Sequence, residues 1–301
     1  MDNTRKFPLI LSSFWLKVIA LLTMTIDHVG YMMCDYGFYP EVGEAFRIIG
    51  RLALPLFCFM IAEGAMRTKS FGKYVLRLGI MAGAISIVLI VAEYVPQFPS
   101  MRDQGIIFLD LLLGAVAVFC LRQKKWYVKA LGVLPLLYGV ASFFASALEN
   151  CGCHGHILWF PFFLRTQYGW FAILLIILFY VANLLSGLFT SYLSSLSGIP
   201  QEQYKDTDVE RHSINIISVC MLALASLLLY LSGRMLQTIN PNYIYWMLNI
   251  QLFAMLSGAF ILLYNGRRGY NKKWFQYGSY LFYPVHLAII YLIFELIWRL
   301  S

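Results

Sequence analysis

The chain has 301 residues, of which 60% are hydrophobic and only 13% are charged, and its mean hydropathy is +0.69. Because soluble globular domains carry about a quarter charged residues, this composition excludes that class and indicates a polytopic membrane protein. The net charge of +8 does not indicate nucleic-acid binding, since the Lys and Arg residues are spread among several loops and do not gather in one groove.

A helix needs about 20 mostly apolar residues to cross a bilayer, and every backbone polar group must be satisfied within it. By that criterion the sequence predicts an all-α membrane protein with nine spans. They run at residues 14–33, 46–66, 73–95, 105–121, 127–148, 168–190, 214–232, 243–264 and 276–298. We expect residues 1–301 to form a single integral membrane domain, because the longest polar interval, 192–213, is too short to bury its own core.

Lys and Arg are concentrated in alternate loops, which predicts the orientation, because basic loops stay on the cytoplasmic side. The segment before the first span and the loops after the even-numbered spans are basic, whereas the loop after the first span is acidic. The N-terminus is therefore expected inside and the C-terminus outside. The predicted location is a cell membrane, in the simplest case the bacterial cytoplasmic membrane, with lipids as partners.

Charged side chains within the spans mark a candidate site, because each costs about 3 kcal/mol at bilayer depth. The predicted orientation places five ionisable residues in one layer near the outer surface: Asp27, His28, Arg47, Arg51 and Asp110. Adjacent helical residues point about 100° apart, so Asp27 is expected to pair with an arginine and not to orient His28. Such a pair could also do no more than pin two helices together.

Four blocks of sequence resemble the TraX family, named for the conjugative F-pilin acetylase, and occur in the family's order. They are LKVIALLTMTIDHVG (16–30), FRIIGRLALPLFCFMIAEGAMRTKSFGKYVLRLG (46–79), QYGWFAILL (167–175) and YLFYPVHLAII (280–290). The resemblance implies a membrane acyltransferase that uses acetyl-CoA. Asp110 and the CGCHGH loop at 151–156 depart from the family's pattern, and they leave open whether the acceptor is a peptide amine or a glycan hydroxyl.

The charged layer also suits acyl transfer on its own chemistry. Transfer from a thioester to an amine or hydroxyl needs a base for the acceptor proton and positive or N–H groups for the developing oxyanion. His28 is the candidate base, and His286 is the rival base or a donor to the thioester carbonyl. Arg51 or Arg47 is expected to stabilise the oxyanion or to hold an anionic acceptor, and Asp110 is the other candidate substrate-binding residue.

The acyl-CoA donor is expected to come from the cytosol, where its phosphates would meet basic side chains. Arg67, Lys73 and Arg77, beside Glu63, are the candidate binding residues for it on the inner side. Cytoplasmic loops are rich in Lys and Arg in any case, so this loop would be basic even if it bound no ligand. No phosphate loop or glycine-rich nucleotide fingerprint occurs in the sequence.

Two alternatives stay open. Intramembrane charges at several depths, together with Gly and Pro breaks, would equally serve a secondary transporter of a small polar or anionic solute. The CGCHGH loop could form a disulfide with Cys34 or bind a soft metal ion through thiolates and imidazoles. No metal is expected among the candidate catalytic residues.

Overall fold

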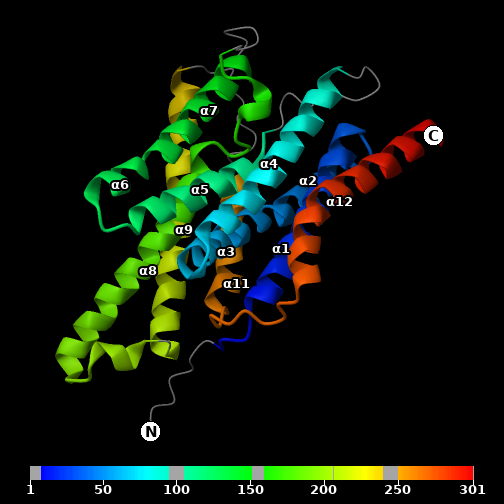
Figure 1. The fold of residues 1–301 in the computed structure, drawn as a ribbon. Coiled ribbons are helices and arrows are strands. Elements are labelled where there is room, and N and C mark those ends of the chain that lie inside the picture. Colours follow the sequence, from blue (N-terminus) through cyan, green and yellow to red (C-terminus); the bar gives the residue numbers. More distant parts are fainter. Residues whose placement is uncertain (1–7, 95–104, 151–158, 206, 240–249, 301) are drawn as a thin grey trace. The chain divides into compact units, whose positions relative to one another are not determined.

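A computed structural model describes residues 8–94, 105–150, 159–205, 207–239 and 250–300, and every regular element in these ranges is a helix (Figure 1). Seven helical stretches among the described residues are long and apolar enough to cross a membrane: Ser13–Asp35, Pro40–Arg67, Phe71–Val91, Trp126–Glu149, Trp170–Ser197, Asp208–Thr238 and Lys273–Leu300. The chain is therefore an all-α, multi-pass membrane protein, as predicted. The count of nine spans and the cytosolic N-terminus stay predictions.

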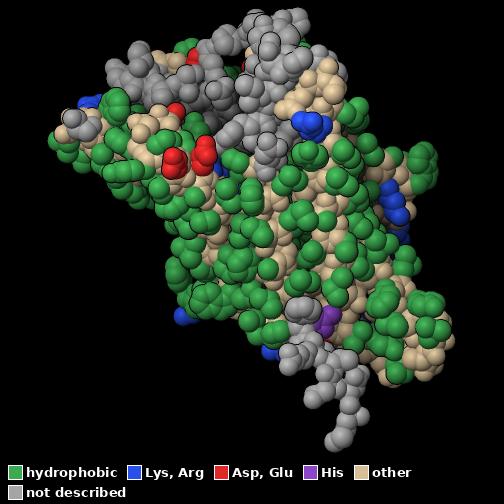
Figure 2. Space-filling view, turned by 180° about the vertical axis from the view of Figure 1, so that it is seen from behind, with side chains coloured by type: hydrophobic (Ala, Val, Ile, Leu, Met, Phe, Trp, Pro, Cys, Tyr) green, Lys and Arg blue, Asp and Glu red, His purple; other side chains and the backbone are tan. Residues whose placement is uncertain are grey.

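Apolar side chains remain uncovered along several of these helices, which is the pattern that lipid requires. In Phe71–Val91 and in Lys273–Leu300, only 17% of an apolar stretch of 18 residues is buried within the protein. Figure 2 shows a face on which hydrophobic side chains predominate and charged ones are few. A soluble protein rarely exposes so much contiguous apolar surface, so hydrocarbon is the natural solvent for these faces.

The predicted spans correspond to helices with some shifts and breaks. Five of them correspond to single long helices: α1 (Ser13–Asp35), α4 (Phe71–Tyr94), α8 (Trp170–Ser197), α9 (Asp208–Ile239) and α12 (Lys273–Leu300). The fourth predicted span is the shorter helix α5 (Ile107–Leu121), and residues 252–262 of the eighth form the 3-10 helix η3 (Leu252–Ser257) and α11 (Gly258–Leu262).

Two predicted spans are each broken into a pair of helices. Residues 46–66 fall in α2 (Pro40–Gly50) and α3 (Ala53–Arg67), and residues 127–148 fall in α6 (Trp126–Leu131) and α7 (Leu134–Asn150). Pro55 and Pro135 follow the two breaks. A proline lacks the N–H that would bond the carbonyl four residues earlier, and its ring clashes with that carbonyl. Each proline therefore ends the preceding helix about one turn upstream.

The chain divides into two compact units. The first consists of Met1–Phe57, Val181–Leu227 and Trp246–Ser301, and the second of Cys58–Tyr180 and Leu228–Tyr245.

In the first unit, α1 packs against α2 along a seam of glycines. An added Cβ on Gly30 of α1 would come within 2.6 Å of the Gly43 carbonyl oxygen, and one on Gly43 would come within 2.9 Å of the Gly30 carbonyl oxygen. Gly50 lies two turns further along α2, so close to Asp27 that an added Cβ would overlap the Asp27 side chain. Small residues let membrane helices approach backbone to backbone. This seam brings the polar residues of α1 and α2 together.

The same unit holds the bent helix α12 against α1. Figure 1 shows α12 changing direction part-way along its length, and Pro284 lies inside the helix. At one end of α1, the Leu11 and Ser13 amides donate to the carbonyl oxygens of Leu263 and Arg267. At the other end, Tyr36 lies edge-on to Trp298, with ring centroids 5.9 Å apart. The first contacts join the start of α1 to the segment that precedes α12, and the last joins the residue after α1 to α12 itself, so that α1 lies beside α12.

Near that second end, the Tyr36 hydroxyl donates to Glu295 Oε2 at 3.1 Å, and Arg299 Nε donates to Glu295 Oε1 at 2.8 Å. Burial, together with the hydrogen bond to Glu295 and the negative charges nearby, raises the pKa of Tyr36 to about 12. The phenol therefore stays protonated and keeps donating to Glu295 over the physiological pH range.

The second unit is organised around α5, which packs against α4, α6 and α7. The segment before α8 includes the 3-10 helix η1 (Phe162–Leu164), which contacts α4. Arg165 anchors this segment, because its guanidinium donates to both Glu149 carboxylate oxygens, at 2.5 and 2.8 Å, and to the Phe160 carbonyl. Irregular backbone at membrane depth needs such internal partners, since lipid offers none.

Candidate functional site

A buried cluster of opposite charges lies between α1 and α2. Arg51 is 2% exposed, and its Nη2 donates to Asp27 Oδ1. Arg47 Nε lies 3.7 Å from the same oxygen, and its guanidinium stacks over the Tyr31 ring at 5.1 Å. The pairing of Asp27 with an arginine, which the 100° helical step predicts, is therefore present. Two positive groups share one carboxylate, so the cluster carries a net positive charge.

The local sequence explains why both arginines reach Asp27. Arg47 and Arg51 are four residues apart, so they lie one above the other on the same face of the chain segment. Arg51 also donates from Nε to the Arg47 carbonyl oxygen at 3.1 Å, which is one of the carbonyls left open where Pro55 ends the helix. Gly43 and Gly50 lie with Arg47 on the buried face of α2, and Arg51 follows directly after the helix. The glycines bring the helices close, and the arginines project beside them.

His28, the residue after Asp27, forms a pair with a second histidine, His286. His28 Nδ1 is 2.9 Å from His286 Nε2 of α12, and His286 Nδ1 is 2.7 Å from the Phe282 carbonyl oxygen. His286 is buried, and its ring stacks on the ring of Phe282 with centroids 4.9 Å apart. The sequence singled out His28 as an intramembrane ionisable residue and His286 through the YLFYPVHLAII block, and the structure places the two in contact.

These contacts set the tautomers of the neutral pair, because each hydrogen bond needs one donor. The Phe282 carbonyl only accepts, so His286 Nδ1 carries a proton and His286 Nε2 is a free acceptor. His28 Nδ1 must then donate to His286 Nε2, which leaves His28 Nε2 with its lone pair. The pair therefore presents one basic nitrogen, on His28, with the second imidazole behind it.

One residue beside the charged cluster was not predicted from the sequence. Gln251 is 3% exposed, and its Oε1 accepts from Arg51 Nη1 at 3.4 Å. It lies within the predicted span 243–264, where an uncharged amide barely alters the hydropathy. A polar amide inside an apolar segment, facing a bundle interior, is the signal that could have identified it.

The remaining candidate residues belong to the second unit. Arg67 Nη2 lies 2.9 Å from Glu63 Oε2, one turn apart on α3, and Arg67 and Lys73 are exposed while Arg77 is half-buried. Asp110 is fully buried and accepts from the Gln167 amide at 2.7 Å and the Tyr168 amide at 3.3 Å. Asp110 therefore holds the backbone immediately before α8, and its predicted contact with substrate stays a prediction.

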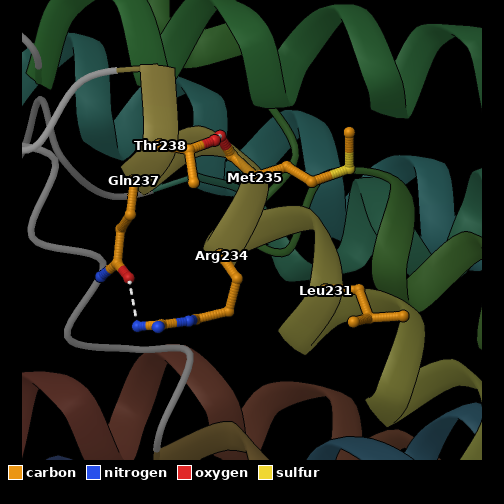
Figure 3. Close-up of a pocket in the computed structure, with 5 residues that line it drawn as sticks. All are labelled: Leu231, Arg234, Met235, Gln237 and Thr238. Carbon is orange, nitrogen blue, oxygen red and sulfur yellow. Dashed lines mark hydrogen bonds between the residues drawn. The ribbon is translucent and has the colours of Figure 1, made fainter.

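Two further features are the predicted Cys and His loop and a pocket on α9. The CGCHGH loop at 151–156 lies outside the described residues, while Cys34 is a free thiol. A pocket of about 600 Å³ lies along the last turns of α9, lined by Leu231, Arg234, Met235, Gln237 and Thr238 (Figure 3). Its Arg234 Nη1 donates to Gln237 Oε1 at 3.0 Å, and its lining residues include neither an imidazole nor a carboxylate for proton transfer.

Comparison with known proteins identifies the family. The chain matches the model of the family described as TraX protein over residues 12–257, which is most of its length. It belongs to the TraX family. The match includes α1, α2 and Gln251 and ends before α12, so the involvement of His286 rests on the YLFYPVHLAII block and on its contact with His28.

Two relatives match shorter stretches of this TraX-family chain. A probable fimbrial assembly protein, FimC of serogroup H1 from Dichelobacter nodosus, is 40% identical over 67 residues, covering 22% of this chain and 27% of that protein. The uncharacterized protein RP591 of Rickettsia prowazekii (strain Madrid E) is 50% identical over 44 residues, which is 15% of each chain. The chain thus aligns with about a quarter or less of each relative. No solved structure gives a significant match.

Proposed function

We propose that this protein is a membrane acyltransferase that moves an acetyl or other small acyl group from cytosolic acyl-CoA to an extracytoplasmic acceptor. The observation that carries the proposal is the pair of histidines with defined proton positions beside a buried, net positive cluster. A base with one available lone pair and a cation within the same helix bundle are the two groups that acyl transfer requires. Membership of the TraX family is compatible with this chemistry.

In the proposed reaction, the nitrogen or oxygen of the acceptor attacks the thioester carbon while its proton passes to His28 Nε2. The carbonyl π electrons move to oxygen, and the oxyanion formed is stabilised by the positive charge of Arg51. His28 is then an imidazolium, and its Nδ1 proton is shared with His286 Nε2, which spreads the charge over two rings. Collapse of the intermediate breaks the carbon–sulfur bond, and the CoA thiolate takes the proton from His28 Nε2.

Asp27 has a positioning role in this scheme. Its carboxylate holds Arg51 and lies near Arg47, so the guanidinium groups keep a fixed place without a substrate. Positive groups that are already in place cost no reorganisation when charge develops, which is the source of their catalytic value. Arg47 is the proposed contact for an anionic group on the acceptor, and Asp110 is the other proposed substrate contact.

The acyl donor is proposed to bind on the cytosolic side and the acceptor on the extracytoplasmic side. Arg67, Lys73 and Arg77 are the proposed binding residues for the CoA phosphates, since guanidinium and ammonium groups are the usual partners of phosphate, and Glu63 takes part by holding Arg67. The acceptor is proposed to be a pilin-related peptide amine or a glycan hydroxyl. Two comparisons favour a peptide amine as the acceptor. One is the name of the TraX family, and the other is the partial similarity of this chain to a fimbrial assembly protein.

The proposal is tested by incubating purified protein with acetyl-CoA labelled in the acetyl group and following the release of free CoA and acetylated acceptor. His28→Ala should bind acetyl-CoA but transfer the acetyl group about 100- to 10,000-fold more slowly, because a positioned base is worth that much. His212→Ala on α9 is the matched control and should keep the wild-type rate. Equal rates in His28→Ala and wild type would contradict the assignment, and solute uptake without CoA release would favour the transporter.

A further inference from the structure

Gln251 carries a buried hydrogen-bond donor that the charged cluster does not use. Its side chain is 3% exposed, and its Nε2 has no hydrogen-bond partner among the described residues. The amide orientation is not ambiguous, because the Arg51 guanidinium has only donors and must therefore face Gln251 Oε1. The NH₂ group then points away from Arg51, and within the part of the chain that the structure describes its protons have no acceptor.

An unpaired donor in this position is unfavourable without a ligand. Buried polar groups are nearly always hydrogen-bonded, and in a membrane-embedded bundle lipid cannot supply the missing acceptor. Arg51 fixes the side chain from one side, so the NH₂ group cannot turn toward the guanidinium to find a partner. The arrangement is that of a donor held ready for an oxygen atom that arrives with a substrate.

We propose that Gln251 is a further catalytic residue, whose Nε2 donates a hydrogen bond to the carbonyl oxygen of the transferred acyl group. The inference rests on the proposed function. The Gln251 amide and the Arg51 guanidinium lie side by side, and Arg51 is joined through Asp27 to the helix that carries His28. The attacking nitrogen or oxygen needs its lone pair for the thioester carbon, whereas the carbonyl oxygen gains negative charge and can accept two donors.

The step balances without any further reactant. As the acceptor attacks, the carbon–oxygen double bond becomes a single bond and its electron pair rests on the oxygen, which accepts from Gln251 Nε2 and is stabilised by the nearby positive charge of Arg51. His28 Nε2 holds the acceptor's proton during this step. When the double bond re-forms, the carbon–sulfur bond breaks and the thiolate takes that proton, so Gln251 ends the cycle with both of its own protons.

Two substitutions separate this role from mere support of Arg51. Gln251→Glu keeps an oxygen for Arg51 but loses the donor, whereas Gln251→Met loses both without adding charge. Loss of one oxyanion donor typically lowers kcat by about 100- to 1,000-fold, so both variants should show that loss with the KM for acetyl-CoA little changed. The exposed Gln203→Met is the control and should keep the wild-type kcat.

The outcomes distinguish the possible failures, provided that thermal unfolding shows each variant folded. Wild-type kcat in Gln251→Glu with a loss only in Gln251→Met would show that Gln251 merely supports Arg51, and would overturn the proposal. Loss only in Gln251→Glu would indicate charge repulsion and would overturn it too. If the wild-type protein itself transfers no acetyl group from acetyl-CoA, the proposed function fails, and this inference fails with it.

Discussion

The glycine seam between α1 and α2 makes a quantitative prediction about the site that it supports. In Gly30→Ala, the new Cβ would lie 2.6 Å from the Gly43 carbonyl oxygen and 2.7 Å from the Phe46 Cβ, where ordinary contacts begin near 3.4 Å. Both neighbours are fixed to the backbone and cannot rotate away. The two helices must therefore separate by several tenths of an ångström, which pulls the arginines of α2 away from Asp27.

Such overpacking costs about 1 to 3 kcal/mol. Alanine is also a better helix former than glycine by about 1 kcal/mol, so the net loss for Gly30→Ala is roughly 0 to 2 kcal/mol. Gly278→Ala in α12 supplies the matched control, because nothing lies within 4 Å of its added Cβ. The control keeps the helix-propensity gain without the clash, so the difference between the two variants isolates the steric cost.

The measurement is unfolding of each purified variant in a mixed-micelle titration with a denaturing detergent, followed by circular dichroism. The free energy of unfolding of Gly30→Ala should be about 1 to 3 kcal/mol below that of Gly278→Ala. Acyl transfer should fall in the Gly30 variant as well, because Arg51 and Asp27 lose their spacing. Equal stability in the two alanine variants would show that the helices adjust freely, and would refute the seam as the element that positions the site.

Three other predictions concern different parts of the mechanism. His286→Ala should lower kcat less than His28→Ala while leaving acetyl-CoA binding intact, since His286 orients the base and shares its charge; a larger loss than in His28→Ala would exchange the two roles. Neutralising Arg67 and Arg77 together should weaken acetyl-CoA binding roughly 10- to 100-fold per broken charge-assisted contact, measured by equilibrium binding on protein with unchanged expression, and unchanged affinity would exclude that binding site. Reporter fusions should place the N-terminus in the cytosol and the C-terminus outside, and a cytosolic C-terminus would require an even number of spans.

The class of fold could be predicted from the sequence because bilayer thickness sets a simple length rule for apolar helices. The ends and breaks of the helices could not. Helices α8 and α9 extend beyond the predicted spans into polar residues, since backbone hydrogen bonding continues where the lipid ends. Pro55 divides a continuous apolar run into α2 and α3, and hydropathy does not register that division.

The candidate site could be predicted only as far as helical geometry reaches. The spacing of Arg47 and Arg51, and the angle between Asp27 and His28, are properties of single helices and were readable from local sequence. The contact of His28 with His286 joins residues 258 positions apart, and only the family resemblance pointed toward it. Gln251 gave no signal in hydropathy, because one uncharged amide does not disturb an apolar span, and only its polar side chain within that span could have marked it.

Asp27 and Asp110 show why a charge in a membrane segment identifies a site only when its partners are known. Both are buried carboxylates in apolar helices, and from the sequence alone the same desolvation cost is expected for each. Asp27 pairs with side-chain cations, which can also contact a substrate. Asp110 accepts two backbone amides ahead of α8, in a place where lipid could not satisfy them. A carboxylate bound to side chains can take part in chemistry at little structural cost, whereas one that holds the backbone gives up the start of a helix if it moves.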